Sequence, residues 1–220
     1  MPVTEKETSR RPLKSRDTGW AKAFAAALAR RKVTPNSISV ASVVFAAGSA
    51  ATLFVSGQDF AHPRWLWLLV AAAFIQLRLL CNLLDGMVAV EGGMKTKSGE
   101  VFNDFPDRIA DSLIFIATGY ATLGLPYGIV LGWSAALLAV FTAYVRMLGG
   151  AAGLPQSFIG PMAKQQRMAV MTIACILSTF ETYLLRAGTV FWISLIVINA
   201  GCVVTIVRRT WIIVRELESR

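Results

Sequence analysis

Four aspartates fall within one short stretch of the sequence, between two long apolar runs. Asp85 lies near the end of the first run, and Asp104, Asp107 and Asp111 open the second. Side chains four residues apart share one face of an α-helix, so Asp107 and Asp111 would point the same way, with Asp104 close to them. Carboxylate and amide oxygens are hard ligands that suit Mg²⁺, Ca²⁺ or Mn²⁺ rather than Zn²⁺. The spacing therefore indicates a site for a divalent cation.

A second polar face precedes this one. Arg78, Asn82 and Asp85 are separated by four and three residues, and Asn103 precedes Asp107 by four. Two antiparallel helices joined by a short loop would bring the two faces together. A carboxylate in the hydrocarbon costs from about 2.5 kcal/mol upward, and neighbouring carboxylates repel one another. A bound cation would relieve both costs.

The alternative reading of two of these residues is structural. Arg78 and Asp111 each lie about one turn deeper than the main cluster, so they could form a buried salt bridge while the other polar residues cap helices. For this pair the alternative stays open. It does not account for the whole set.

The elements that must position these residues have the composition of a membrane protein. Of the 220 residues, 55% are hydrophobic and 16% are charged, which excludes an ordinary soluble domain. A helix that crosses a bilayer needs about 20 apolar residues. Six stretches approach this length: 37–57, 65–90, 108–124, 127–148, 166–186 and 189–211. We therefore predict an all-α integral membrane protein with six transmembrane helices.

The distribution of basic residues predicts the topology. Lysine and arginine gather before the first span, between the second and third, around the loop between the fourth and fifth, and at the C-terminus. The alternate loops carry few of them, so the positive-inside rule places both termini in the cytoplasm. The net charge of +9 then reflects membrane topology, and we expect no nucleic-acid partner.

The segment before the first span is predicted to lie in the membrane interface. Trp20, Phe24 and Leu28 are four residues apart, which is typical of an amphipathic helix, although a cytosolic linker helix is the alternative. The chain thus divides into a disordered basic tail, an amphipathic juxtamembrane helix, a six-helix transmembrane domain and a cytoplasmic tail: residues 1–16, 17–33, 34–214 and 215–220.

Two prolines bear on the predicted helix boundaries. In the string VTPNSIS, Pro35 can end the preceding helix, and Asn36 or Ser37 can cap the first span. Pro106 is compatible with the third span if the regular helix begins just before it, because a proline in the first turn loses no needed hydrogen bond.

The acidic stretch resembles the signature of the CDP-alcohol phosphotransferases, D-x-x-D-G-x-x-A-R followed after about eight residues by G-x-x-x-D-x-x-x-D. The matching positions stand in register without a gap: Asn82, Asp85, Gly86, Ala89, Val90, Gly99, Asn103 and Asp107. The resemblance covers nearly the whole chain, since the family has six spans, an amphipathic helix before the first, and often a TPN-IS entry. Asn82 and Asn103 replace aspartates, and Val90 replaces the arginine. Some members carry a similar N-E/D-x-x-D-x-x-x-D variant.

The resemblance implies a reaction and a role for each residue. An acceptor hydroxyl attacks the phosphorus of a CDP-linked donor, and CMP leaves. For a site within a membrane, the expected donor is CDP-diacylglycerol. Mg²⁺ or Mn²⁺ is the implied cofactor, and a carboxylate takes the hydroxyl proton. The predicted catalytic residues are Asp107 and Asp111; the implied metal ligands are Asn82, Asp85, Asn103, Asp104 and Asp107; and the residues that would let the nucleotide approach the backbone are Gly86, Ala89 and Gly99.

The expected partners are CDP-diacylglycerol or another CDP-alcohol, an acceptor alcohol and the lipid bilayer. Further residues could bind these partners. Arg146, Lys164 and Arg167 could hold an anionic acceptor or the phosphates of the donor, although positive-inside anchoring explains them almost as well. Gly128 and Gly132 form a small-xxx-small pair that could pack a neighbouring helix or a second protomer in a homodimer.

Two other functions compete with the enzyme. The substitutions at Asn82, Asn103 and Val90 favour a non-catalytic member of the family that binds nucleotide or lipid. A cation or proton transporter is the third alternative, but it predicts polar residues along several spans instead of at one edge. We expect an integral protein of a prokaryotic cell membrane.

Overall fold

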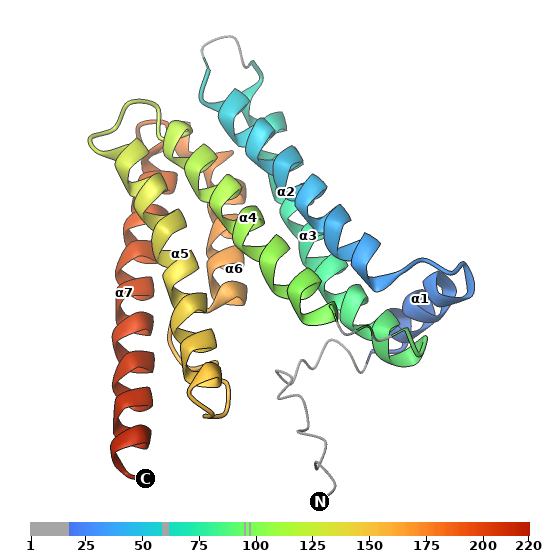
Figure 1. The fold of residues 1–220 in the computed structure, drawn as a ribbon. Coiled ribbons are helices and arrows are strands. Elements are labelled where there is room, and N and C mark those ends of the chain that lie inside the picture. Colours follow the sequence, from blue (N-terminus) through green and yellow to red (C-terminus); the bar gives the residue numbers. More distant parts are fainter. Residues whose placement is uncertain (1–17, 59–61, 95, 97) are drawn as a thin grey trace, which may run out of the picture.

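The computed structural model describes residues 18–58, 62–94, 96 and 98–220 as helices joined by short connections (Figure 1). The described part of the chain contains no β-strand, which confirms the predicted all-α fold. The helices are α1 (Gly19–Arg30), α2 (Pro35–Ser56), α3 (Arg64–Glu91), α4 (Gly99–Tyr120), α5 (Gly128–Ala151), α6 (Lys164–Ser178), the short 3₁₀ helix η2 (Glu181–Tyr183) and α7 (Thr189–Glu218).

Four of these helices are long and apolar enough to cross a membrane: α2, α3, α5 and α7. The other two long helices differ from the prediction. The first half of α4 carries the aspartates, which lowers its apolar character. The 15 residues of α6 would rise only about 22 Å, because the predicted span over 166–186 is broken after Ser178.

The segment that follows α6 contains a buried carboxylate. Glu181, 3% exposed, accepts hydrogen bonds from the backbone nitrogens of Gly188 and Val190 and from Arg64, whose Nη1 lies 2.6 Å away. Arg64 also donates to backbone carbonyls at the ends of α2 and α4. This network ties four helices together at the end of the bundle opposite the acidic cluster, and it explains why the apolar stretch does not continue as a helix.

The six long helices form a closed ring. Packing runs from α2 to α3, α6, α7, α5, α4 and back to α2, so α3 and α4 flank α2 and face each other across the interior. Helix α1 lies against α3, with Ala21 and Ala25 buried and Trp20 and Phe24 exposed. In Figure 1 the polar end of α3 and the beginning of α4 lie at the lower side, near α1. The ring therefore turns the two polar faces inward.

Helices α4 and α5 approach each other through glycines. Gly128 and Gly132 are buried, and a Cβ built on Gly132 would lie 2.7 Å from the carbonyl oxygen of Phe115 and 2.9 Å from the Cα of Gly119. The small-xxx-small pair thus packs against a neighbouring helix of the same chain. Of the two alternatives for Gly128 and Gly132, packing against a neighbouring helix is the one that the structure shows, and this covered face leaves no room for a second protomer.

Gly132→Ala should destabilise the protein because its methyl group would press on the backbone of α4. We expect a loss of about 1–3 kcal/mol, measured as a lower midpoint of thermal unfolding in detergent. The control is Gly150→Ala in the same helix, where the nearest atom, Cγ of Gln156, lies 3.6 Å from the added Cβ. Equal midpoints for the two variants would contradict the close approach.

Two helix starts differ from the predicted ones. Thr34, not Asn36 or Ser37, caps α2: its Oγ1 accepts from the Ser37 nitrogen at 3.2 Å, and Pro35 is the first helical residue. The threonine hydroxyl satisfies a backbone donor that would otherwise have no partner in the first turn. Helix α4 begins at Gly99, so Pro106 lies inside it. The cost is one intrahelical hydrogen bond that the Pro106 nitrogen cannot donate.

Candidate active site

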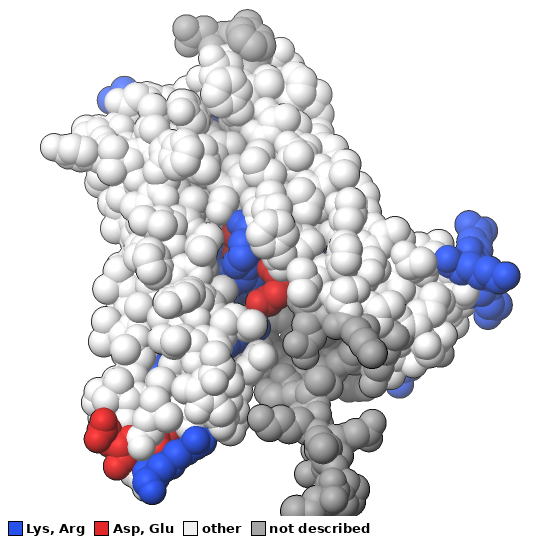
Figure 2. Space-filling model, viewed as in Figure 1, with Lys and Arg blue, Asp and Glu red and all other residues white. Residues whose placement is uncertain are grey.

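A cavity of about 520 Å³ opens inside the ring, and Figure 2 shows charged side chains within a hollow of an otherwise mostly uncharged surface. Helices α3, α4, α5 and α6 all contribute to its wall. The predicted site residues that line it are Asn82, Asn103, Asp104, Asp107, Arg146, Lys164 and Arg167. Residues far apart in the sequence thus meet at one place.

The carboxylates of α4 that face the cavity are already paired with cations. Asp104 accepts from Arg146 at 2.5 Å and lies 3.9 Å from Arg108. Asp107 pairs with Lys164 from the start of α6, with Arg78 of α3 at 3.5 Å, and with Arg108 at 3.8 Å. An added anion or metal ion must therefore compete with ion pairs that close the site.

Asp111 lies behind the cavity wall in a fully buried cluster. Its two carboxylate oxygens accept from Arg78 at 2.6 Å and from Arg167 at 2.7 Å, and all three residues are at most 1% exposed. Arg167 also donates to Thr142 and to the Met162 carbonyl. The buried salt bridge that the sequence left open for Arg78 and Asp111 is confirmed, and it extends to a third helix.

On α3, Gln76 and Asn82 line the cavity, whereas the predicted ligand Asp85 is not among its described lining residues. Asp85 is 4% exposed; its Oδ2 accepts from the Ser39 hydroxyl at 2.7 Å and its Oδ1 from the Gly86 nitrogen at 2.5 Å. Asn82 lines the cavity, and its buried Nδ2 has no hydrogen-bond partner among the described residues. This amide is free to interact with a group that enters the cavity.

The small residues of the motif lie at the edge of the site. Gly86, Ala89 and Gly99 are each partly exposed, and among the described lining residues of the cavity none of the three appears. A Cβ on Gly99 would meet only Thr96 Oγ1, at 3.5 Å. Space for an approaching group therefore exists beside Gly99.

Positive charge exceeds negative charge along the described cavity wall. Its carboxylates are Asp104 and Asp107, and its cationic residues are Arg108, Arg146, Lys164, Arg167 and Arg209. The buried Nε atoms of Arg108 and Arg146 have no hydrogen-bond partner among the described residues. Guanidinium and ammonium groups in this number suit phosphate oxygens, which accept charge-assisted hydrogen bonds.

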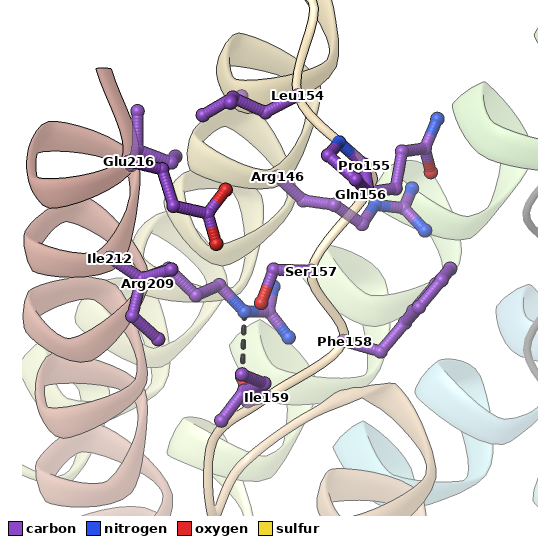
Figure 3. Close-up of a pocket in the computed structure, with 12 residues that line it drawn as sticks. Arg146, Leu154, Pro155, Gln156, Ser157, Phe158, Ile159, Arg209, Ile212 and Glu216 are labelled. Atoms are coloured by element: carbon purple, nitrogen blue, oxygen red, sulfur yellow. Dashed lines mark hydrogen bonds between the residues drawn. The ribbon is translucent and has the colours of Figure 1, made fainter. Parts of the chain in front are cut away.

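A second cavity, of about 280 Å³, adjoins the first and shares Arg146, Phe158 and Arg209 with it (Figure 3). It lies between the end of α5, the loop that follows, and the last turns of α7. Arg209 donates to the Ile159 carbonyl at 2.8 Å, and Arg146 lies over the Phe158 ring at 5.4 Å. The loop after α5 is thus held against both cavities by arginines.

The donor set suits a hard divalent cation. Asn82, Asp85, Asn103, Asp104 and Asp107 offer only oxygen ligands once the amides turn their carbonyls inward. Among the described residues no three histidine, cysteine, aspartate or glutamate side chains gather around one point. The chemistry of the residues fits such an ion, provided that the cations on Asp104 and Asp107 move aside.

Three residues at the site were absent from the predicted set. Arg108 follows Asp107 directly, at a position for which the signature specifies no residue. Arg209 was read as part of the basic C-terminus, although Arg208 is exposed and Arg209 is 4% exposed. Ser39 contacts Asp85 across 46 positions of sequence. Only the TPN-IS resemblance pointed to the Ser39 segment, and helix periodicity gave no signal for the contact.

The sequence profile described as CDP-alcohol phosphatidyltransferase matches residues 32–213, which is most of the chain. The chain belongs to the CDP-alcohol phosphatidyltransferase family. The resemblance inferred from the motif is thereby confirmed, and with it the class of enzyme.

Relatives and solved structures agree with this membership. The phosphatidylinositol phosphate synthase of Mycolicibacterium smegmatis is 27% identical over 188 residues, covering 84% of this chain and 79% of that protein. The synthase of Streptomyces avermitilis is 25% identical over 198 residues, covering 88% and 77%. The crystal structure of the Mycobacterium tuberculosis synthase with CDP-DAG bound has a similar fold, with a TM-score of 0.72, 20% identity, and coverage of 88% of this chain and 92% of that one.

Within this CDP-alcohol phosphatidyltransferase, the three departures from the signature occupy different surroundings. Asn82 and Asn103 line the cavity, whereas Val90 is 46% exposed near the end of α3. Replacing two aspartates by asparagines removes two negative charges from the cavity wall. The remaining carboxylates therefore carry more of any interaction with a cation.

Proposed function

We propose that this phosphatidyltransferase transfers a phosphatidyl group from CDP-diacylglycerol to an acceptor alcohol and releases CMP. The observation that carries the proposal is the cavity, in which carboxylates from α4 lie beside cations from α5 and α6. A pyrophosphate needs the cations, and an attacking hydroxyl needs a carboxylate. The M. tuberculosis structure that contains CDP-DAG supports the choice of donor.

Asp107 is the proposed general base. The acceptor oxygen forms a bond to the phosphorus next to the diacylglycerol, the bond from that phosphorus to the CMP oxygen breaks, and the hydroxyl proton passes to Asp107. Lys164, which pairs with Asp107, must release it for this step. Asp111 does not line the cavity; its proposed role is to hold Arg78 and Arg167 in place through two ion pairs.

Mg²⁺ or Mn²⁺ is the proposed cofactor, with Asn82, Asp85, Asn103, Asp104 and Asp107 as its ligands. When bound, such an ion neutralises the pyrophosphate and stabilises the leaving CMP. A structure of the M. tuberculosis synthase in complex with manganese and citrate, with a TM-score of 0.72 and 20% identity, supports a divalent ion in this fold.

The substrates are assigned to the two sides of the cavity. Gly86, Ala89 and Gly99 border the proposed nucleotide path at the ends of α3 and α4. Arg146 and Lys164, with Arg167 behind them, would hold an anionic acceptor. Because the relatives named above are phosphatidylinositol phosphate synthases, inositol phosphate is the first acceptor to test.

The membrane setting follows from the same ring of helices. We propose that α2 to α7 all cross a prokaryotic cell membrane, that α1 lies in its interface, and that both termini are cytoplasmic. The exposed Trp20 and Phe24 support the place of α1, since exposed aromatic side chains favour the headgroup region. A homodimer remains a prediction and would need a surface other than the covered glycine pair.

The experiment that tests the function is CMP release by the purified protein in liposomes containing CDP-diacylglycerol. With Mg²⁺ or Mn²⁺ and a panel of acceptors, including inositol phosphate, glycerol phosphate and serine, we expect CMP with one acceptor and none after addition of chelator. If no acceptor of the panel yields CMP although the protein clearly binds nucleotide, the result would favour the non-catalytic alternative that Asn82 and Asn103 motivate.

A further inference from the structure

The start of α2 makes a direct contact with the acidic motif. Ser39 is 3% exposed, and its Oγ lies 2.7 Å from Oδ2 of Asp85 and 3.2 Å from the Pro35 carbonyl. A serine hydroxyl has one proton to donate. The shorter contact and the charged acceptor both favour the hydrogen bond to Asp85, because charge-assisted hydrogen bonds are shorter and stronger.

This hydrogen bond and one from the backbone fix the orientation of the carboxylate. Ser39 donates to Oδ2 and the Gly86 nitrogen to Oδ1, so each oxygen of Asp85 is held by one donor. Each oxygen keeps a further lone pair for a cation. Asp85 is the one carboxylate of the sequence between Arg64 and Val90, since position 82 is asparagine. Its orientation therefore decides what α3 can offer to an ion.

The TPNSIS string explains how Ser39 reaches this position. Thr34 caps the helix and Pro35 is its first residue, which together fix where the helix begins. Ser39 is then one turn inside α2, on the side that packs against α3. Ser42, one turn further along the helix, is 0% exposed but donates to the Ser39 carbonyl instead of to a carboxylate.

We propose that Ser39 is a positioning residue that orients Asp85 toward the divalent cation. The inference rests on the proposed metal-dependent function. Groups that hold a metal ligand from behind typically change metal affinity or activity by about 10–100-fold when they are removed. Ser39 has this relation to the proposed ligand Asp85, because it donates to the carboxylate from α2; neither residue is among the described lining residues of the cavity.

The test compares two nearly isosteric variants of the full-length protein in detergent. Ser39→Thr keeps the hydroxyl, whereas Ser39→Val replaces it by a methyl group. The affinity for Mn²⁺, followed by electron paramagnetic resonance without nucleotide, should fall about 10–100-fold for Ser39→Val and stay within about threefold for Ser39→Thr. Ser42→Ala is the matched control, and its Mn²⁺ affinity should also stay within about threefold of wild type.

A merely structural hydrogen bond predicts a different result. Ser39→Val would then lower the midpoint of thermal unfolding in chelator but bind Mn²⁺ as tightly as Ser39→Thr, and this outcome would overturn the proposal. If the valine variant does not fold, Ser39→Ala replaces it with the same criterion. If the wild-type protein did not bind Mn²⁺, this result would instead contradict the proposed metal-dependent function, and the proposed role of Ser39 would fall with it. The two failures are therefore distinguishable.

Discussion

Asp107→Asn should abolish metal-dependent CMP release while leaving the protein folded. The substitution keeps the shape of the side chain but removes both the proposed base and a proposed ligand. Loss of a general base alone lowers rates by about 10²–10⁴-fold. Its main ion-pair partner, Lys164, has a side chain that is 23% exposed, so the unpaired ammonium can reach water. We therefore expect a large loss of turnover and a small change in stability.

CMP release and thermal unfolding in the same detergent decide this prediction. Glu218→Gln, which removes a carboxylate from the exposed end of α7, is the control and should keep the wild-type rate. CMP release by Asp107→Asn at more than a tenth of the wild-type rate would exclude Asp107 as the base.

Asp111→Asn should have the largest effect on stability. Asp111 neutralises two arginines that are 0% and 1% exposed. Its removal leaves Arg167 buried without a carboxylate and Arg78 with only the 3.5 Å contact to Asp107. Breaking a buried ion pair from one side costs about 3–5 kcal/mol. The measurement is the free energy of unfolding, or the thermal midpoint, in detergent.

The matched control for Asp111 is Asp104→Asn on the same helix. The Asp104 side chain is 28% exposed and its partner Arg146 is 16% exposed, so loss of this pair should cost about 1 kcal/mol or less. If Asp111→Asn kept wild-type stability but lost turnover, Asp111 would belong to the catalytic set and the buried cluster would not be structural.

Both predictions depend on which carboxylate faces the cavity, and the sequence alone could not tell whether this is Asp107 or Asp111. Asp107 and Asp111 follow each other at helical spacing, and either one fits a catalytic or a structural role. The separation arises because Arg78 and Arg167 approach from α3 and α6 and enclose Asp111. Such contacts join positions 33 and 56 residues apart, which no local pattern encodes.

The limits of the predicted helices have similar causes. The start of α2 was misplaced by a few residues because Thr34, Asn36 and Ser37 are all good caps, and the choice depends on which one the first turn contacts. The end of α6 was misplaced because Glu181 is paired with Arg64, 117 positions away in the sequence. Apolar composition predicts that a segment is buried in lipid or protein, but not where a distant arginine stops its helix.

The sequence by itself determined the family, the class of enzyme and the all-helical class, and it predicted the residues of the site. These follow from residue types and short spacings, which the 3.6-residue period converts into faces of single helices. The tertiary structure alone decided the ring order that sets α3 opposite α4, the cations that pair with Asp104 and Asp107, and the contact of Ser39 with Asp85. Those features depend on how whole helices pack, and packing depends on surfaces contributed by distant segments.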